Sequence, residues 1–356
     1  MKIAQVAPLY ESVPPRLYGG TERVVYHLTE QLVQQGHDIT LFASGDSESS
    51  AKLRPMCDRA LRLQGKKIID SLAHHVRMIE IVAREARHFD IVHFHIDYLH
   101  FPVSRAHRIP ALTTLHGRLD IPDLVPLYRE FDDMRLVSIS DNQRAPLSWA
   151  NWAGTVYHGF PETLFNFNRT PGRYLAFLGR FCPEKRPDRA IEIAKRAGIP
   201  LKIAAKIDPV DQEYFETRVR GLLDDPLVEY VGEIGQSEKD EFLGNALALL
   251  FPIDWAEPFG LAMIEALACG TPVIAWPLGS VPEIIEDGVN GFLVEDVASA
   301  AKAVERLDVI DRAACRRIFE QRFSARRMAA DYLKIYERLA PRRRERVSRA
   351  GTLVNA

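Results

Sequence analysis

The hydrophobic positions of this chain fall into short runs that are separated by longer amphipathic stretches. The first run covers residues 2–7, a glycine-containing loop follows, and residues 21–35 have the spacing of a helix that Gly36 ends. Residues 37–43 form the next run, so this segment is predicted to be a βαβ unit with two parallel strands. Further strands are expected at residues 91–94, 112–115, 136–139 and 155–157, and a further helix at 68–87. The pattern therefore predicts an open, doubly wound α/β sheet.

The second half of the chain repeats the same alternation. Strands are expected at residues 174–178, 201–205, 228–231, 247–251, 272–275 and 291–294, and helices at 187–197, 212–223, 237–245, 260–268 and 298–307. Residues 158–173 are rich in proline, glycine and asparagine and are predicted to be the linker. A last helix at 325–339 has one apolar face, formed by Met328, Tyr332, Ile335, Tyr336 and Leu339. We therefore expect Rossmann-like domains over residues 1–163 and 164–323, a helix over 324–340 and a basic tail over 341–356.

Length and composition narrow the class of protein. The 356 residues suit two domains at roughly 150 residues each. A formal net charge of −2 argues against a dedicated nucleic-acid binder, so no nucleic-acid partner is expected. The four cysteines are far apart and form no C-x-x-C pair, which predicts reduced thiols and neither a zinc site nor a disulfide framework. These cysteines are Cys57, Cys182, Cys269 and Cys315.

The ends of the chain bear on its location. Residues 1–7 carry a single lysine, and Pro8 and Glu11 interrupt any apolar core, so no signal peptide is predicted. The longest apolar run, residues 246–253, is too short to span a bilayer. A cytoplasmic location is therefore expected. The basic residues at 342–346 could make a weak peripheral contact with anionic lipid, and the alternative is a solvated tail.

Two loops have the chemistry of an anion site. Gly19 and Gly20 allow a ligand to approach the backbone closely, just before a helix N-terminus, although they also fit a plain tight turn. Arg180 ends the first strand of the second half, and Lys185 lies in the loop beyond it. The carboxyl ends of parallel strands face the ligand crevice of α/β sheets, where a guanidinium and an ammonium group suit a diphosphate. The alternative is a pair of solvated surface cations.

The segment 254–265 gives the strongest signal. A strand ends before it, a polar loop carries Glu257, and a helix opens near Gly260 and carries Glu265. A helix rises about 1.5 Å per residue, so Glu265 is expected roughly 7 Å beyond Gly260 along the helix. One carboxylate then lies in front of the helix N-terminus and the other beside it, with the free amides of Gly260 and Leu261 between them. This arrangement fits a nucleotide sugar, and the alternative is an acidic loop and a surface helix.

Histidines form the last group of candidates. His116 follows a strand of the first half and is expected to face the same crevice, although a structural histidine is the alternative. His93 and His95 share one face of a strand, with Asp97 nearby, but no third convergent metal ligand can be identified. We therefore predict no metal site.

Together these residues resemble the retaining glycosyltransferases of family four, which have the GT-B fold. The resemblance covers nearly the whole chain, to about Leu339. Its elements are Tyr18-Gly19-Gly20, Leu115-His116-Gly117, Gly179-Arg180, Glu184-Lys185, the two glutamates Glu257 and Glu265, and the segments 268–275, 279–283 and 287–292. It implies two Rossmann-like domains facing a central cleft, the first on the acceptor side and the second binding the donor, and a last helix that crosses back to the first domain.

The resemblance also implies roles. Gly19 and Gly20 leave room for the donor phosphates and the acceptor, Arg180 and Lys185 hold the diphosphate, and His116 orients the transferred sugar. Glu257 binds donor-sugar hydroxyls near the backbone of Phe259, Gly260 and Leu261, and Glu265 binds the ribose. No metal or other cofactor is expected. The family's Gly-rich turn is replaced here by residues 205–209, where Lys206 could add a cation, so the base is unassigned and UDP is favoured as the family's commonest donor base.

The implied activity is transfer of a hexose-type sugar to an acceptor hydroxyl with retention of configuration, in polysaccharide or glycoconjugate biosynthesis. The acceptor, whether a glycan, a lipid-linked molecule or a small molecule, cannot be identified from the sequence. Alternatives are an epimerase or phosphorylase on the same fold, or a non-catalytic subunit that binds nucleotide sugars. A glycosidase also uses two carboxylates, but it needs no diphosphate clamp.

Overall fold

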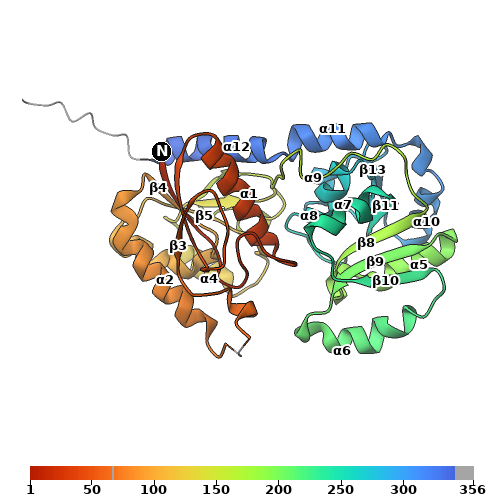
Figure 1. Cartoon of the computed structure of the whole chain (residues 1–356), viewed down its shortest axis with the longest axis horizontal. Helices are drawn as coiled ribbons and strands as arrows, with labels where there is room; N and C mark the ends of the chain where they lie inside the picture. The colour runs from red at the N-terminus through yellow and green to blue at the C-terminus, as the bar shows by residue number, and fades with distance from the viewer. Residues whose placement is uncertain (66–67, 341–356) are drawn as a thin grey trace, which may run out of the picture.

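The computed structural model describes residues 1–65 and 68–340, which form two α/β domains (Figure 1). The first domain is built on a seven-stranded sheet with the order β3-β2-β1-β4-β5-β6-β7, and every pairing in it is parallel. Its strands are β1 (Lys2–Val6), β2 (Asp38–Ala43), β3 (Lys52–Pro55), β4 (Ile91–Phe94), β5 (Ala111–Thr114), β6 (Leu136–Ser138) and β7 (Trp152–Thr155). Its main helices are α1 (Gly20–Gln34), α2 (Ser71–Glu85), α3 (Phe101–His107) and α4 (Leu124–Glu130).

The second domain has a parallel six-stranded sheet with the order β10-β9-β8-β11-β12-β13. Its strands are β8 (Tyr174–Arg180), β9 (Leu201–Lys206), β10 (Val228–Gly232), β11 (Ala246–Phe251), β12 (Val273–Ala275) and β13 (Gly291–Leu293). Its helices are α5 (Pro187–Ala197), α6 (Gln212–Tyr214), α7 (Gln236–Gly244), α8 (Leu261–Ala268), α9 (Val281–Ile284), α10 (Val297–Val304) and α11 (Arg312–Arg322). Two parallel doubly wound sheets are the architecture that the hydrophobic pattern predicts.

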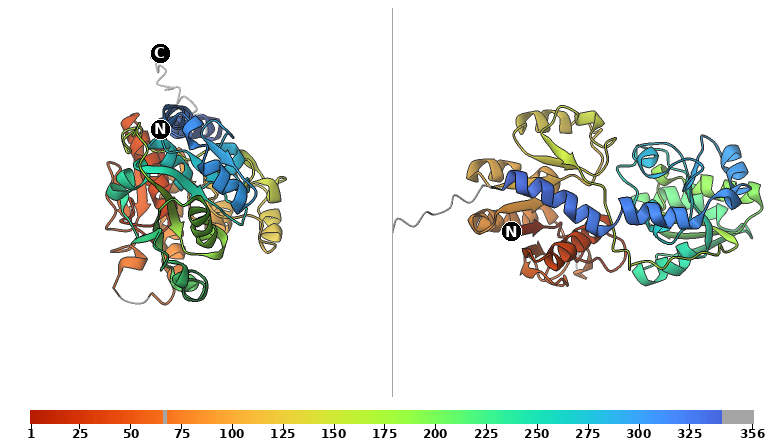
Figure 2. Two further views of the ribbon diagram at one scale, coloured as in Figure 1. Left: turned by 90° about the vertical axis from the view of Figure 1, so that its right-hand side faces the viewer. Right: turned by 90° about the horizontal axis from the view of Figure 1, so that it is seen from above.

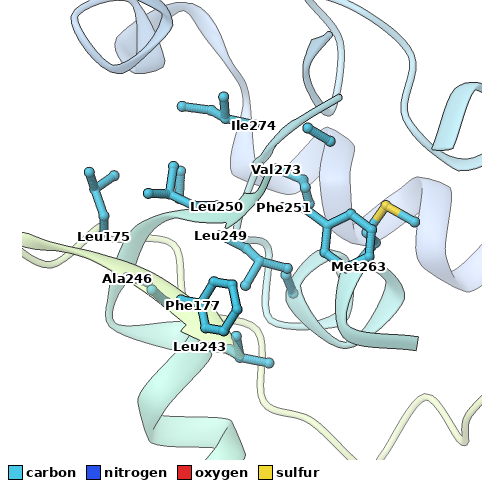
Figure 3. Close-up of a cluster of buried hydrophobic side chains, with 14 of the residues drawn as sticks. Leu175, Phe177, Leu243, Ala246, Leu249, Leu250, Phe251, Met263, Val273 and Ile274 are labelled. Atoms are coloured by element: carbon cyan, nitrogen blue, oxygen red, sulfur yellow. The ribbon is translucent and has the colours of Figure 1, made fainter. Parts of the chain in front are cut away.

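The core of the second domain explains why its strands are nearly all apolar. The central strand β11 packs against β8 and β12 in the sheet, and side chains from α7 and α8 cover it (Figure 3). Leu249 and Leu250 alternate to opposite faces of this strand, yet neither is more than 1% exposed because helices cover both faces. This core fixes the carboxyl ends of β8 and β11, from which the loops of the site extend.

The chain crosses between the domains twice, and the two crossings lie side by side. The Phe160 amide donates to the Phe323 carbonyl at 3.0 Å, and the Ala325 amide donates to the Phe160 carbonyl at 2.8 Å. After the second crossing α12 (Ala325–Leu339) lies along the first domain, as Figures 1 and 2 show from three directions. Its face around Tyr332 and Tyr336 is buried in the same cluster as residues of α1 and β2.

Some elements differ from the prediction. The edge strand β3 was not expected, because its four residues are mostly exposed and carry no apolar alternation. Strand β7 ends at Thr155, where a strand was expected to begin. The expected helix at 212–223 is divided into α6, a π-helical segment over Phe215–Val219 and a 3-10 turn over Arg220–Leu222. Helix α11 escaped prediction because only Arg312, Cys315 and Phe319 of it are buried.

Two further predictions concern contact with lipid and the crossing of a membrane. The basic segment at 342–346 lies outside the described residues, so its proposed lipid contact stays untested. Across residues 1–65 and 68–340, no helix combines the length and the apolarity that crossing a bilayer requires.

Candidate active site

A cavity of about 770 Å³ lies between the two domains, at the carboxyl ends of their central strands. Every residue that the sequence analysis proposed for the site lines it: Gly19, Gly20, His116, Arg180, Lys185, Glu257, Phe259, Gly260, Leu261 and Glu265. The structure therefore brings together groups that are far apart in the sequence. The roles assigned to them remain predictions, since co-location alone does not establish a role.

Lys185 and Glu257 form an ion pair in this cavity. The Trp255 indole nitrogen donates to the same Glu257 oxygen at 3.0 Å, and the Lys185 ammonium lies 5.4 Å from the centre of the Trp255 ring. The side chains of Lys185 and Glu257 are only 21% and 10% exposed, so these groups are held in place rather than free on a surface. The Arg180 guanidinium approaches Asp211 at 3.1 Å in the same way. Both predicted diphosphate cations thus have carboxylate partners that a ligand must compete with.

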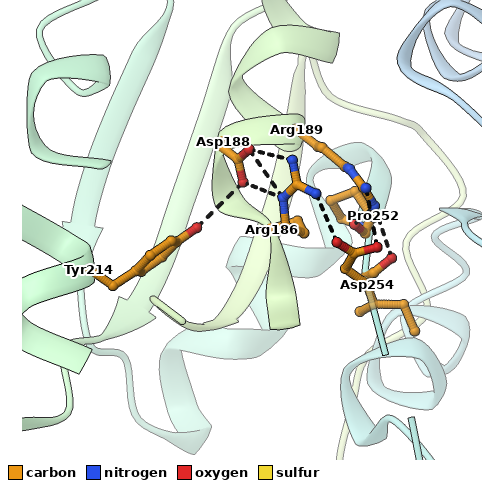
Figure 4. Close-up of polar contacts among 7 residues, drawn as sticks. Arg186, Asp188, Arg189, Tyr214, Pro252 and Asp254 are labelled. Carbon is orange, nitrogen blue, oxygen red and sulfur yellow. Dashed lines mark hydrogen bonds and ion pairs between the residues drawn. The ribbon is translucent and has the colours of Figure 1, made fainter. Parts of the chain in front are cut away.

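Hydrogen bonds connect the segment that follows Lys185 to the loop that carries Glu257 (Figure 4). Arg186 donates to Asp188 in the first turn of α5 and, at 3.0 Å, to Asp254 in the loop that carries Glu257. Arg189 donates to the other oxygen of Asp254 at 3.2 Å, and the Asp254 amide donates to the Glu184 carbonyl at 2.8 Å. These bonds fix the position of Lys185 relative to Glu257, which is the preorganisation that an electrostatic site needs.

Glu265 lies on α8 and is 2% exposed. One of its oxygens accepts hydrogen bonds from Arg23 of α1 at 2.8 Å and from Lys239 of α7 at 2.7 Å. Burial alone would raise the pKa of Glu265, but Lys239 and Arg23 outweigh burial and hold that pKa below its usual value. Glu265, which is predicted to bind the ribose, is therefore also the central carboxylate of an ion triad that joins the two domains.

The sequence analysis did not identify Arg23 and Lys239 as the partners of Glu265. Arg23 is in the first turn of α1 and also donates to the Leu17 carbonyl at 2.9 Å, so it ties the glycine loop to α8. Lys239 occupies a helix that looks solvent-facing in sequence, yet it is 8% exposed. Arg23 and Lys239 stand out as partners of Glu265 because both cations are buried, and the burial of a side chain cannot be read from a single sequence.

His116 lies at the base of the cavity in a chain of buried polar groups. Its Nε2 atom is 2.9 Å from His95 Nδ1, and its ring stacks on that of His158 with 5.3 Å between centres. Burial lowers the pKa of His116 to about 3, so the ring is neutral at physiological pH and can take part in hydrogen bonds as a neutral imidazole. This state fits the orienting role that the resemblance implies.

The other predicted histidines have structural partners. His93 bonds Tyr336 and Thr114, both at 2.7 Å, and His95 bonds Gln5 at 2.8 Å. These contacts connect the floor of the cavity to α12, and they satisfy ring nitrogens that a metal would need. Over residues 1–65 and 68–340, no group of three or more histidine, cysteine or acidic side chains has the arrangement of a metal site.

The glycine loop and the start of α8 are tightly packed. Gly260 has φ +81°, and a Cβ atom there would lie 2.6 Å from Met263 Cε and 3.1 Å from a Phe251 ring carbon. Gly19 has φ +155°, and a Cβ atom there would lie 2.7 Å from Pro15 Cβ. Across the cavity the Tyr18 amide donates to Glu233 at 3.1 Å, so the two domains are already in contact at its rim.

Gly260→Ala is expected to destabilise the protein more than Gly36→Ala does. Gly36 has the nearly identical φ of +82° but nothing within 4 Å of its missing Cβ, so it measures the cost of the backbone conformation alone. That cost is about 1–2 kcal/mol for a residue with a Cβ atom, and overpacking at Gly260 should add about 1–3 kcal/mol. Urea denaturation of the two variants tests this, and equal losses of unfolding free energy would show that the start of α8 can relax.

Comparison with known proteins identifies the family. Residues 162–317 match the family of glycosyl transferases group 1, and residues 18–178 match glycosyltransferase family 4. A curated relative, the D-inositol 3-phosphate glycosyltransferase of Mycobacterium marinum, is 33% identical over 154 residues, which are 39% of this chain and 31% of that protein. An uncharacterised Klebsiella pneumoniae protein from a cps region is 31% identical over 170 residues, 46% of either chain. The chain thus spans less than half the length of these curated relatives.

Solved structures show the same fold over nearly the full length. Sucrose-phosphate synthase from Thermosynechococcus elongatus matches with a TM-score of 0.76 and 20% identity, covering 95% of this chain and 99% of that one. The Anabaena protein HepE in complex with UDP and glucose matches with a TM-score of 0.74 and 16% identity, with the same coverage. These likenesses confirm the predicted GT-B architecture. With both halves of the chain matched by glycosyltransferase families, the protein belongs to the GT-B glycosyltransferases of the family-four kind.

Proposed function

We propose that the protein transfers a hexose-type sugar from a nucleotide-diphosphate sugar, with UDP-sugars favoured, to an acceptor hydroxyl with retention of anomeric configuration. The observation that carries the proposal is the arrangement around the start of α8. Lys185, Arg180, Glu257 and Glu265 line one cavity together with Gly260 and Leu261 at the start of α8. Glu257 pairs with Lys185, and Glu265 lies on α8 itself. Cations, helix amides and carboxylates that line one cavity suit a diphosphate flanked by two groups of hydroxyls.

The chemistry follows from the charges that develop during transfer. Breaking the bond between the anomeric carbon and the diphosphate oxygen builds negative charge on the leaving group. Lys185, Arg180 and the amides at the start of α8 would stabilise that charge without a metal ion. The acceptor oxygen forms the new bond to the anomeric carbon, and its proton passes to the departing diphosphate. Glu257 would bind hydroxyls of the donor sugar once Lys185 has turned to the phosphate.

The choice of a UDP-sugar as donor is supported by the fold neighbour HepE, which is described in complex with UDP and glucose, and the reaction class by the mycobacterial relative, which is named as a glycosyltransferase. All four cysteines are unpaired, which favours a reducing compartment, and the proposal places the activity in the cytoplasm.

The proposed activity can be tested without knowing the acceptor. Purified protein is incubated with UDP-, GDP-, ADP- and dTDP-hexoses, and release of the nucleoside diphosphate is measured in EDTA and in Mg²⁺. We expect slow release from one donor at equal rates in both buffers. Release that requires Mg²⁺ or Mn²⁺ would contradict metal-free leaving-group stabilisation. If a nucleotide sugar stabilises the protein against heat but no nucleoside diphosphate is released, the protein would be a non-catalytic subunit.

A further inference from the structure

Gln5 is a polar side chain inside an otherwise apolar, buried part of a strand. It lies in β1, and it is as fully buried as its neighbours Ala4 and Val6. A buried carboxamide costs free energy unless its donor and its acceptor are both bonded. The Gln5 side-chain nitrogen donates to the Tyr336 hydroxyl at 3.2 Å, and the Gln5 side-chain oxygen lies 2.8 Å from His95 Nε2. Gln5 is therefore held in one orientation, with its oxygen toward His95.

This orientation decides which nitrogen of His95 carries a proton. A carbonyl oxygen can only accept a hydrogen bond, so His95 Nε2 donates to Gln5. Burial holds the pKa of His95 well below its ordinary value, so the ring is neutral and has a single N–H group. His95 Nδ1 is then an acceptor, and His116 Nε2, which lies 2.9 Å from it, is the donor.

His116 is the end of this hydrogen-bond chain that lines the cavity. Its ring is neutral as well, so a proton on Nε2 leaves Nδ1 with an unshared lone pair. Stacking on His158 restrains the plane of the ring. Within the part of the chain that the structure describes, no hydrogen bond reaches His116 Nδ1. His116 therefore offers a ligand a hydrogen-bond acceptor and not a donor.

The bonds on the other side of Gln5 run in the same direction. Because Gln5 donates to the Tyr336 oxygen, the Tyr336 hydroxyl donates to His93 Nδ1 at 2.7 Å. Burial keeps the His93 ring neutral, so His93 Nε2 donates to the Thr114 hydroxyl at 2.7 Å. Hydrogen bonds that follow one another in one direction strengthen each other. A reversal at His116 would require the Gln5 amide to turn over together with every proton of the chain.

We propose that Gln5 and His95 are positioning residues that hold His116 as its Nε2–H tautomer, so that His116 Nδ1 accepts a hydrogen bond from one hydroxyl of the transferred sugar. This inference deepens the proposed function and rests on it, because it places the sugar beside His116. Gln5 is fully buried and acts on the sugar only through the two histidines. Tyr336 makes α12 the support of this chain, since it fixes the orientation of the Gln5 amide.

The tautomer can be measured by NMR on protein labelled with 15N in its histidines, because protonated and unprotonated ring nitrogens have well-separated shifts. The His116 signals are assigned from their loss in His116→Gln. The wild type should show His116 only as the Nε2–H form. Gln5→Met removes the acceptor from His95 Nε2, so His95 is better protonated at Nδ1 and donates to His116 Nε2. We therefore expect the Nδ1–H form of His116 to appear in Gln5→Met.

His100→Asn is the matched control for this measurement. His100 is also a fully buried histidine that is bonded through both ring nitrogens, but it does not line the cavity. The change removes buried hydrogen bonds from the same domain without touching the chain from Gln5 to His116. We expect the His116 tautomer to be unchanged in His100→Asn, which separates a specific effect of Gln5 from general loosening of the domain.

Donors in which single sugar hydroxyls are replaced by fluorine test what His116 Nδ1 binds. Fluorine cannot donate a hydrogen bond, so one of these donors should lose turnover by about fivefold in the wild type, the value of one hydrogen bond. The same replacement should cost less in Gln5→Met, where His116 Nδ1 carries a proton. Comparing the two losses isolates the coupling between Gln5 and that hydroxyl, because other effects of fluorine are common to both proteins.

The outcomes distinguish this proposal from the proposed function. Gln5→Met should bind the nucleoside diphosphate, which has no sugar to transfer, within about twofold of the wild type. An Nδ1–H form in the wild type would overturn the proposal even where Gln5→Met folds poorly. A tautomer that Gln5→Met leaves unchanged, or fluorine losses that do not depend on Gln5, would overturn it as well. If the wild type turns over no donor at all, the proposed function fails, whereas the NMR result still decides the tautomer.

Discussion

Lys185→Ala is expected to lower donor-dependent turnover by roughly a hundredfold to a thousandfold. The change removes one preorganised charge from the leaving group, and the loss of one such contact typically costs about 2.7–4 kcal/mol at the transition state. Lys185→Arg keeps the charge but not its shape, so it should recover activity only in part. Release of nucleoside diphosphate under saturating donor measures both variants.

The stability cost of Lys185→Ala should be larger than a solvated lysine would give. The side chain is 21% exposed and paired with Glu257, so its removal leaves a largely buried carboxylate that has lost its cation and keeps the hydrogen bond from the Trp255 indole. We expect a loss of about 1–3 kcal/mol in unfolding free energy. Lys195→Ala is the matched control, because Lys195 is 51% exposed and pairs with Asp225 outside the cavity. If Lys185→Ala keeps near wild-type turnover, Lys185 does not hold the diphosphate.

Glu265→Gln is expected to cost about 3–5 kcal/mol of unfolding free energy. The substitution keeps the shape but removes the charge that offsets Arg23 and Lys239, and both cations remain buried without a counter-ion. Urea denaturation measures the loss. The control is Glu320→Gln, since Glu320 is 45% exposed and pairs with Arg316 one helical turn away, so that it should change stability by less than about 1 kcal/mol.

The same triad gives an expected pH dependence. The pKa of Glu265 is lower in the folded protein than its ordinary value of 4.5, so its stabilising contribution is complete above that value and is lost as the pH falls through the folded pKa. The stability difference between wild type and Glu265→Gln should therefore stay constant between pH 7 and about 5 and shrink as the pH is lowered below 4.5. A difference that stays constant or grows below pH 4.5 would show that Glu265 is not ionised in the triad.

Most of the fold could be predicted because the signals that mark strands and helix ends lie within short segments of the sequence. Buried parallel strands such as β11 are continuous apolar runs, and punctuation such as Pro187 and Gly198 marks the limits of α5. Edge strand β3 and helix α11 lack this signal, because an exposed strand needs no apolar face and α11 buries few side chains. The π-helical segment after α6 also has no sequence signature, since it is a local adjustment of hydrogen bonding.

The candidate site was only partly accessible to sequence reasoning. Motif residues at strand ends, such as Arg180 and Glu257, could be placed because parallel strands direct their carboxyl ends to one crevice. Their partners could not be placed, because Arg23 meets Glu265 across 242 positions of the chain. The burial of Glu22 in the first turn of α1 and the left-handed backbone of Asp97 could not be predicted either, because neither property is encoded by a short motif.

The most direct test of the central claim is a calorimetric titration that compares a nucleoside diphosphate with its own monophosphate. The base is whichever of UDP, GDP, ADP and dTDP stabilises the protein most against heat. If Lys185 and Arg180 bind the second phosphate, the diphosphate should bind the wild type at least tenfold more tightly than the monophosphate, a difference of about 1.4 kcal/mol, and this preference should largely disappear in Lys185→Ala. Equal affinities in the wild type, or a preference that Lys185→Ala leaves unchanged, would contradict the account.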